Sequence, residues 1–420
     1  MAVLRKPSHF LDALKIPDVR LFLAAVAFST LANRSMLVII GFQIYKLTHN
    51  PAALGWLGLV EAVPAISLVL IGGYLADHFN RRTILLITQA ASCLAAVALA
   101  LLSRGEPSVL SLYAVIFSAG VARAFGDPAR TTFEAQIVPR HLTVNAASWI
   151  SSTWVSCAVA GPVIIGFSFD VLGAAGSYWL ILAGFVLSWI CTACIPPKPQ
   201  PVPEKKEPIF KSIGIGWKFV FANQPLLAAM SLDLFAVLFG GAVALLPIFA
   251  EDILHVGARG LGLLNAAPSL GALIIMLLAT HRPPIGCAGR NLLVSVAGFG
   301  VSILVFAFSR NFWLSMTALF FSGVFDGVSM VIRRSILRLL SPDHLRGRIA
   351  AANWVFISAS NELGAFESGM VAAWIGTIPC VAAGGVVTLC VVGLAAMLAP
   401  QLRGLCFNTA TLEQRDAASA

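Results

Sequence analysis

Charged side chains are scarce in this sequence. Asp, Glu, Lys and Arg make up 11% of its 420 residues, whereas a soluble protein carries about 25%. Hydrophobic residues make up 58% and the mean hydropathy is +0.88. Apolar runs of about 20 residues, the length that a helix needs to cross a bilayer, recur along the sequence. Apolar and polar residues do not alternate in these runs as they do in the strands of a membrane β-barrel. The composition therefore predicts an all-α membrane protein.

Signatures of several other kinds of site are missing. The pattern Gly-x-x-x-x-Gly-Lys-[Ser/Thr] does not occur, so direct ATP coupling is not expected. The His and Cys residues lack metal-ligand spacing, and we interpret Cys191 and Cys194 as small packing residues. No cleavable signal peptide precedes the first apolar run. We expect no cofactor, no metal and no enzymatic activity.

Twelve transmembrane helices are predicted, with both termini in the cytoplasm. Their ranges are 20–46, 52–76, 83–102, 108–129, 144–169, 175–195, 223–249, 258–280, 289–309, 312–333, 347–373 and 377–399. A cytoplasmic linker (196–218), proline-rich at its start, separates an N-terminal six-helix bundle (1–195) from a C-terminal six-helix bundle (219–400). A polar tail (401–420) follows.

The orientation comes from the short turn after the second span. Arg81 and Arg82 lie there, and Lys and Arg accumulate on the cytoplasmic side of membranes. This topology puts 22 of the 28 Lys and Arg in the cytoplasm, 4 outside, and Arg34 and Arg123 within the membrane. The net charge of +9 is thus an orientation signal, and no nucleic-acid partner is expected.

The two bundles repeat each other in sequence. Gly58–Pro64 aligns with Gly262–Pro268 at an offset of 204, and Arg130 aligns with Arg333 at an offset of 203. Parallel repeats of this kind are a transporter architecture with a substrate site near the midplane between the halves.

The sequence resembles the major facilitator superfamily along almost its entire length. Gly73, Asp77, Arg81 and Arg82 match the signature of its helix 2–3 loop, whereas His78 and Asn80 depart from it. Gly161, Pro162 and Gly166 resemble part of the helix-5 antiporter motif of its exporters. Further stretches resemble the branch that contains the enterobactin exporters: Gly126–Arg130, Leu232–Gly241, Arg346–Arg348 and Asn361–Gly369.

The resemblance implies a role for the loop motif. In the family its Asp and Arg join an acid at the cytoplasmic end of helix 4, which is Asp127 here, and hold the two halves together. A cluster of Asp77, Arg81 and Asp127 is then a cytoplasmic gate beside the start of helix 11, whose dipole favours acids. The alternative is a topology signal with a tight turn.

Charged residues inside the spans are the candidates for proton coupling or substrate binding, because each costs about 2.5–3.5 kcal/mol on insertion scales. They are Arg34, Glu61, Arg123, Asp233, Asp326, Glu362 and Glu367. Arg34 and Glu61 are predicted at matching depths, so they form either a structural ion pair or an anion contact with a protonatable counter-ion.

Other candidates follow from the repeat and from burial. Arg123 aligns with Asp326, and the two pair across the cavity or have separate local partners. A carboxyl group buried among apolar side chains takes up a proton more readily than one in water, which favours Asp233 and Glu61 for coupling. Glu362 and Glu367 lie roughly 140° apart on one helix, so they do not both face one site.

These patterns predict a secondary transporter in a bacterial inner membrane. The favoured hypothesis is proton-driven export of a hydrophobic or amphipathic small molecule, such as a siderophore or a drug. An importer or uniporter of a nutrient, and a non-transporting lipid-handling or receptor-like protein, are the alternatives. The expected partners are the substrate, protons and the lipid bilayer, and we expect a monomer.

Overall fold

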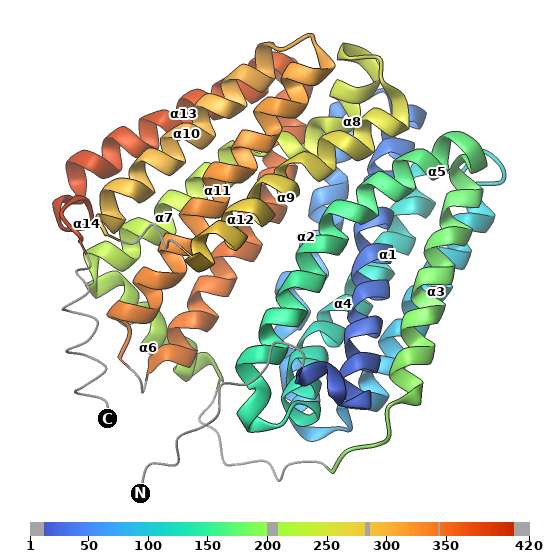
Figure 1. Cartoon of the computed structure of the whole chain (residues 1–420). Coiled ribbons are helices and arrows are strands. Elements are labelled where there is room, and N and C mark those ends of the chain that lie inside the picture. Colours follow the sequence, from blue (N-terminus) through green and yellow to red (C-terminus); the bar gives the residue numbers. More distant parts are fainter. Residues whose placement is uncertain (1–11, 200–208, 282–285, 343–344, 407–420) are drawn as a thin grey trace, which may run out of the picture. The chain divides into compact units, whose positions relative to one another are not determined.

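The computed structural model describes residues 12–199, 209–281, 286–342 and 345–406, and within these ranges all regular structure is helical (Figure 1). Ten segments of the described chain are long and apolar enough to cross a membrane. One of them, Asn145–Cys194, covers all but the end residues of two predicted spans, 144–169 and 175–195. The all-α membrane architecture is confirmed, while the count of twelve spans remains a prediction.

The chain forms two compact units. Unit 1 consists of Met1–Thr48, Val60–Lys205 and Gly257–Ala266, and unit 2 of His49–Leu59, Lys206–Val256 and Ala267–Ala420. The main division, between Lys205 and Lys206, lies within the predicted linker. Two short stretches are exceptions to this division. His49–Leu59, which includes the start of α2, belongs to unit 2, and Gly257–Ala266, the start of α9, belongs to unit 1.

The N-terminal half of the chain contains five long helices. They are α1 (Pro17–Thr48), α2 (Pro51–His78), α3 (Arg81–Leu102), α4 (Val109–Ile137) and α5 (Thr143–Cys194). Within unit 1, α1 packs along α5, and α3 packs against both α4 and α5. Small residues permit these approaches: a Cβ added at Gly120 would lie 2.7 Å from Pro64 of α2, in keeping with close packing of membrane helices at glycine.

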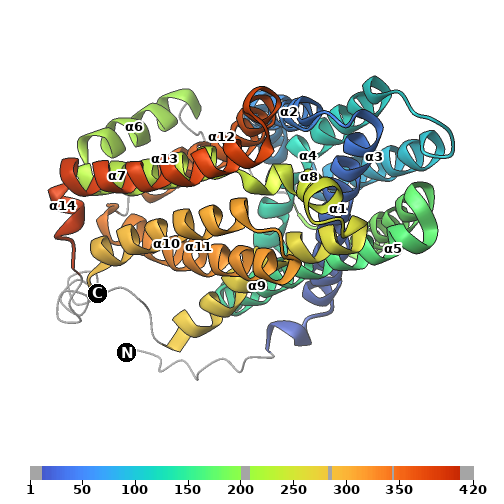
Figure 2. The ribbon, with the colours of Figure 1, turned by 90° about the horizontal axis from the view of Figure 1, so that it is seen from above.

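The C-terminal half contains both long and interrupted helices. They are α6 (Ile209–Ala222), α7 (Gln224–Phe239), α8 (Leu246–Ile248), α9 (Gly257–His281), α10 (Ala288–Phe308), α11 (Phe312–Leu340), α12 (Arg346–Ile375), α13 (Thr377–Leu398) and α14 (Pro400–Arg403). Within unit 2, α10 packs between α11 and α13, and α7 packs against α12 and α13. Figure 2 shows α10 and α11 side by side.

A glycine divides α5 into the two predicted spans 144–169 and 175–195. Gly173 has φ 68° and ψ −173°, a backbone conformation that glycine adopts without a Cβ clash. The break therefore lies between the two predicted spans, although helix continues to within a residue of it on both sides.

The predicted span 223–249 corresponds to one membrane-length segment, Gln224–Ile253, but the helix within it is interrupted. The α-helix stops at Phe239, Gly240 and Gly241 follow, and the chain continues as a 3₁₀ turn (Ala242–Leu245), α8 and a π-helical turn (Phe249–Ile253). Two adjacent glycines lower helix propensity, and Pro247 lacks the amide hydrogen that would continue the hydrogen-bond ladder. This irregular stretch begins seven residues after Asp233.

Two helices run further than their predicted ends at residues 129 and 333. The α4 helix ends at Ile137 and α11 at Leu340. Arg333, the last residue of the predicted span 312–333, therefore lies inside a helix, seven residues before its end. Its side chain is only 12% exposed, so it is a buried residue, and its depth in the membrane remains a prediction.

The segments outside the predicted bundles are partly ordered. The α6 helix begins at Ile209, inside the predicted linker, and packs against α7 and α12. At the other end, Leu402 is fully buried, and the Gly289 amide donates a hydrogen bond to the Leu405 carbonyl at 3.1 Å. The predicted tail therefore begins as a packed part of unit 2, and its residues from 407 onward lie outside the described ranges.

Candidate functional site

A buried cluster of charged side chains joins two helices of unit 2. Arg333 of α11 pairs with Asp233 of α7 through Nη1, and its Nη2 lies 3.6 Å from the Asp326 carboxylate of α11. The exposed side-chain fractions are 12% for Arg333, 11% for Asp233 and 37% for Asp326. We name these three residues the charged cluster.

The local sequence explains why these groups meet. Asp326 and Arg333 are seven residues apart on α11, so they lie on the same face of that helix. The neighbouring positions Leu232, Ile332 and Ile336 are almost completely buried and belong to one apolar core. This core holds α7 and α11 against each other, and the ion pair between Asp233 and Arg333 joins the same two helices.

The charged cluster borders a small pocket of mixed character. Its walls include Asp233 and Asp326, the hydroxyl residue Ser329, and the rings of Phe299 and Phe325. Asp326 thus stays accessible although it lies deep among helices. The Nε of Arg333 is buried and has no hydrogen-bond partner in the described part of the chain, so the guanidinium is not fully satisfied by the two carboxylates.

The cluster gives Asp326 a local partner, one of the two alternatives for this residue. Asp326 has a local partner in Arg333, and Arg334 also acts on it electrostatically. The local-partner alternative is therefore supported for Asp326. Arg123 has interactions of its own, and its role remains a prediction.

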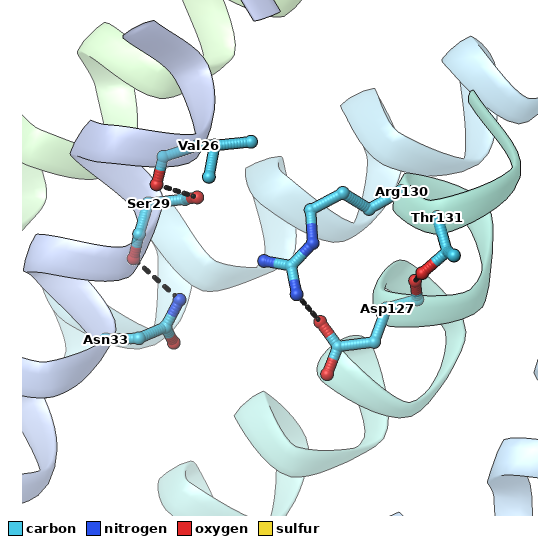
Figure 3. Close-up of polar contacts among 6 residues, drawn as sticks. All are labelled: Val26, Ser29, Asn33, Asp127, Arg130 and Thr131. Carbon is cyan, nitrogen blue, oxygen red and sulfur yellow. Dashed lines mark hydrogen bonds and ion pairs between the residues drawn. The ribbon is translucent and has the colours of Figure 1, made fainter. Parts of the chain in front are cut away.

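Sequence reasoning missed Arg333 as a site residue. The span prediction ended at this arginine because hydropathy falls there, and the residue was assigned to the cytoplasm. The available signal was its alignment with Arg130, an arginine on α4 that pairs with Asp127 at 3.1 Å. Figure 3 shows the guanidinium of Arg130 beside the Asp127 carboxylate. The same view includes a separate contact on α1, in which the Asn33 side chain donates to the Ser29 carbonyl.

In unit 1, Arg34 is held against α5. Its guanidinium lies 4.7 Å from the centre of the Trp154 ring, a favourable cation–π distance. A Cβ added at Gly161 would lie 3.2 Å from the Cβ of Arg34, and the Ser35 hydroxyl donates to the Gly161 carbonyl at 3.1 Å. Arg34 and Glu61 both have further partners, but a pair between them stays a prediction.

The helix-5 residues of the antiporter-like motif are positions of close helix contact. Gly161 and Pro162 are buried, and Gly161 faces α1, as described for Arg34. Gly166 faces the first turns of α9 within unit 1: an added Cβ would lie 2.6 Å from the Ala258 carbonyl. An added Cβ at Gly262 would meet the Pro162 carbonyl. The motif therefore lets α5 touch a helix on each of two faces.

The helix 2–3 loop residues act as helix caps. Asn80, which departs from the family signature, accepts hydrogen bonds from the amides of Arg82 and Thr83 and so caps the start of α3. Arg81 donates to the Ala76 carbonyl at 3.1 Å and to the Thr132 carbonyl at 3.4 Å. Cations near helix C-termini are favourable.

Arg82 caps a second helix end and Asp127 has a local partner. The Arg82 guanidinium donates to the Ala193 carbonyl at 2.7 Å, near the end of α5. Asp127 pairs with Arg130 on its own helix, and Asp77 has interactions of its own. No added Cβ at Gly73 would meet an atom within 4 Å. The gate role of Asp77, Arg81 and Asp127 remains a prediction.

The two acids of α12 differ in how far they can be described. Glu367 is half-buried, and the Ser368 hydroxyl donates to its carboxylate at 3.3 Å. The side chain of Glu362 lies outside the described part of the structure. Among the residues that are described, no group of three or more His, Cys, Asp and Glu has the geometry of a metal site.

A helical membrane protein with ionisable groups buried among its spans has the make-up of a membrane transporter. Comparison with known proteins identifies the class: the family model described as Major Facilitator Superfamily matches residues 22–286, more than half of the chain. The protein belongs to the major facilitator superfamily, whose members are secondary transporters and not enzymes.

Curated relatives and solved structures agree with this assignment. The enterobactin exporter EntS of Shigella boydii is 26% identical over 313 residues, which cover 74% of this chain and 75% of that protein. EntS of Escherichia coli O139:H28 matches to the same extent.

Two solved structures share the fold. A POT family transporter in complex with 5-aminolevulinic acid aligns with TM-score 0.73 and 11% identity over 91% of this chain and 96% of its own. A D-xylose-proton symporter aligns with TM-score 0.73 and 14% identity over 92% and 99%. At these identities the two structures support the fold alone.

Proposed function

We propose that this transporter exports a hydrophobic or amphipathic small molecule, such as a siderophore or a drug-like compound, in exchange for protons. The observation that carries the proposal is the charged cluster. Arg333 contacts two carboxylates, so one of them is free to bind and release a proton while the arginine stays paired with the other. Such a group is what proton coupling requires.

The two carboxylates have different roles in this proposal. Asp233 is nearly buried and holds Arg333, whereas Asp326 keeps 37% of its side chain accessible and lines the pocket. We assign proton exchange to the pair, with Asp326 the member that faces the pocket. The similarity to enterobactin exporters supports the outward direction, and alternating access in a bacterial inner membrane is the proposed setting.

The test has two stages. A transport screen of siderophores and fluorescent dyes in a deletion strain identifies a substrate first. Accumulation of that substrate is then measured in everted vesicles with and without an imposed pH gradient. We expect accumulation only with the gradient, accompanied by proton release from the vesicle lumen. Accumulation that does not depend on the gradient and moves no protons would contradict antiport.

Variants connect the flux to the cluster. We expect Asp326→Asn and Asp233→Asn to lower gradient-driven accumulation by about tenfold or more, the effect of about 1.4 kcal/mol on a barrier. Asp233→Glu keeps the charge and restores part of the rate. Glu106→Gln, in the exposed loop before α4, is the matched control. Full activity of both asparagine variants would remove the cluster from the coupling step.

A further inference from the structure

An apolar crevice opens between α10 and α11 in unit 2. It has a volume of about 320 Å³, at the lower end of the range of about 300–1,000 Å³ for small-molecule pockets. Its walls include Val301, Val305, Leu314, Phe321 and Phe325. The Ser302 hydroxyl, also in the wall, donates to a carbonyl of its own helix at 2.8 Å, which leaves the surface hydrophobic.

We expect the open side of the crevice to face the bilayer. Both helices belong to the segments long and apolar enough to cross a membrane. The wall residues Val301, Leu314 and Phe321 are between 47% and 50% exposed in the protein alone. Apolar side chains on the surface of a spanning helix meet lipid tails and not water.

One side chain separates this crevice from the charged cluster. The Phe325 ring lines both the crevice and the pocket that holds Asp233 and Asp326. The ring lies directly against the backbone of Gly298, where an added Cβ would be 2.6 Å from a ring carbon. The pocket beyond the ring has a volume of only about 10 Å³, so Phe325 would have to change its rotamer to join the two spaces.

The crevice has a defined depth in the membrane. Phe325 lies 13 residues after Phe312, the first residue of α11, roughly 20 Å at 1.5 Å per residue. The predicted topology puts Phe312 at the outer face. The crevice then extends from the outer leaflet to about the middle of the bilayer.

We propose that this crevice is a lateral binding site and passage for the apolar part of an amphipathic substrate, with the Phe325 ring as a movable wall between bilayer and charged pocket. The inference rests on the proposed function and specifies its substrate class. The hydrophobic walls suit a hydrocarbon or aromatic portion, and the charged cluster beyond Phe325 would face a polar or ionised group once the ring has moved. In an exporter the same route lets the substrate leave into the outer leaflet.

Photocrosslinking tests the binding site without requiring transport. The full chain carries p-benzoylphenylalanine in place of Thr317, a crevice residue, in vesicles of phosphatidylethanolamine and phosphatidylglycerol. The vesicles contain trimethylammonium-diphenylhexatriene, an amphipathic fluorophore. After irradiation, intact-mass spectrometry detects the adduct. We expect a fluorophore adduct that Val301→Trp suppresses by filling the crevice.

The control uses another lipid-facing valine of α10. Val294 is 61% exposed and is not among the crevice residues, so Val294→Trp should leave the adduct unchanged. Adducts with phospholipid alone would overturn the inference, because the crevice would then be filled by lipid tails. An adduct that both tryptophan variants reduce equally would also overturn it.

Flux of the same fluorophore tests the passage. In everted vesicles we expect Val301→Trp to slow the initial rate by about tenfold, which is about 1.4 kcal/mol of added barrier, while Val294→Trp has little effect. Loss of the adduct without any change in rate would rule out the passage. If the unmodified protein moves no fluorophore, the proposed function fails for amphipathic compounds of this kind. The adduct at Thr317 still shows whether the crevice binds the fluorophore.

Discussion

Removal of single members of the charged cluster should have graded effects on stability. Arg333 makes its closest contact with Asp233, and its Nη2 lies 3.6 Å from Asp326. Two unit charges about 4 Å apart attract by about 4 kcal/mol at an effective dielectric constant of about 20. Because each partner is desolvated to a different extent, the net cost of removing each one differs.

The structure sets the order of these costs. Arg333→Ala leaves two carboxylates without their cation and should cost about 3–5 kcal/mol, as for other broken buried pairs. Asp233→Ala leaves Arg333 with the more distant Asp326, so we expect about 3 kcal/mol, at the low end of the same range. Asp326→Ala removes a carboxylate that is 37% exposed, and water screening should limit its cost to about 1 kcal/mol.

The free energy of unfolding of the purified full chain, measured in one detergent by denaturant titration, tests this order. A double-mutant cycle between Asp233 and Arg333 should give a coupling energy well above that between Asp326 and Arg333. Asp233→Asn, which keeps the size of the side chain, separates loss of charge from loss of packing. An Asp326→Ala variant as unstable as Asp233→Ala would refute the reasoning.

Three further outcomes follow from local contacts. An alanine Cβ at Gly72 would meet the Ala124 carbonyl, whereas Gly73 has free space. Gly72→Ala should therefore lower the free energy of unfolding, and Gly73→Ala should leave it unchanged or raise it by about 0.5–1 kcal/mol. Asn80→Ala removes the cap of α3 and should cost about 1 kcal/mol in the same unfolding assay, with Asn80→Asp as the conservative control. A hydrogen bond with the Cys287 thiol raises the pKa of Cys406, which lowers the thiolate fraction at neutral pH. Cys287→Ala should therefore speed maleimide labelling of Cys406, followed by mass spectrometry, and an unchanged rate would contradict the contact.

The sequence predicted the helices well where apolar runs end at turn residues. The break at Gly173 falls between two predicted spans because only glycine relieves the strain there. The sequence also contained the signal for the interruption after Phe239, since Gly240 and Gly241 precede Pro247, but a long apolar window conceals it. Hydropathy averages over residues, whereas helix continuity depends on each one.

The site was harder to predict because ion pairing changes where a charged residue can lie. Hydropathy ended the tenth predicted span at Arg333, yet a guanidinium paired with carboxylates is tolerated inside a helix bundle. Asp127 has a partner that the sequence analysis did not name: Arg130, three residues further along the same helix, lies 3.1 Å away. A neighbour one helical turn away is the nearest partner available to a short acidic side chain.

The internal repeat conceals a difference between the halves that bears on the mechanism. Arg130 and Arg333 are equivalent at an offset of 203, yet Arg130 pairs within its own helix and Arg333 joins α11 to α7. The position equivalent to Asp127 is Met330, so Arg333 has no acid one turn before it.

The other side of the contact differs in the same way. The same offset relates Asp233 to Thr30 of α1, a buried residue whose hydroxyl has no hydrogen-bond partner in the described part of the chain. A hydroxyl group does not replace a carboxylate as the counter-ion of an arginine. In the second half an ion pair between Arg333 and Asp233 thus joins the first helix to the fourth, and the equivalent pair of positions in the first half, Arg130 and Thr30, has no carboxylate to form it. Arginines that the repeat aligns thus have different contacts, and a proton taken up by Asp233 would loosen the ionic contact between α7 and α11 without changing the pair in α4.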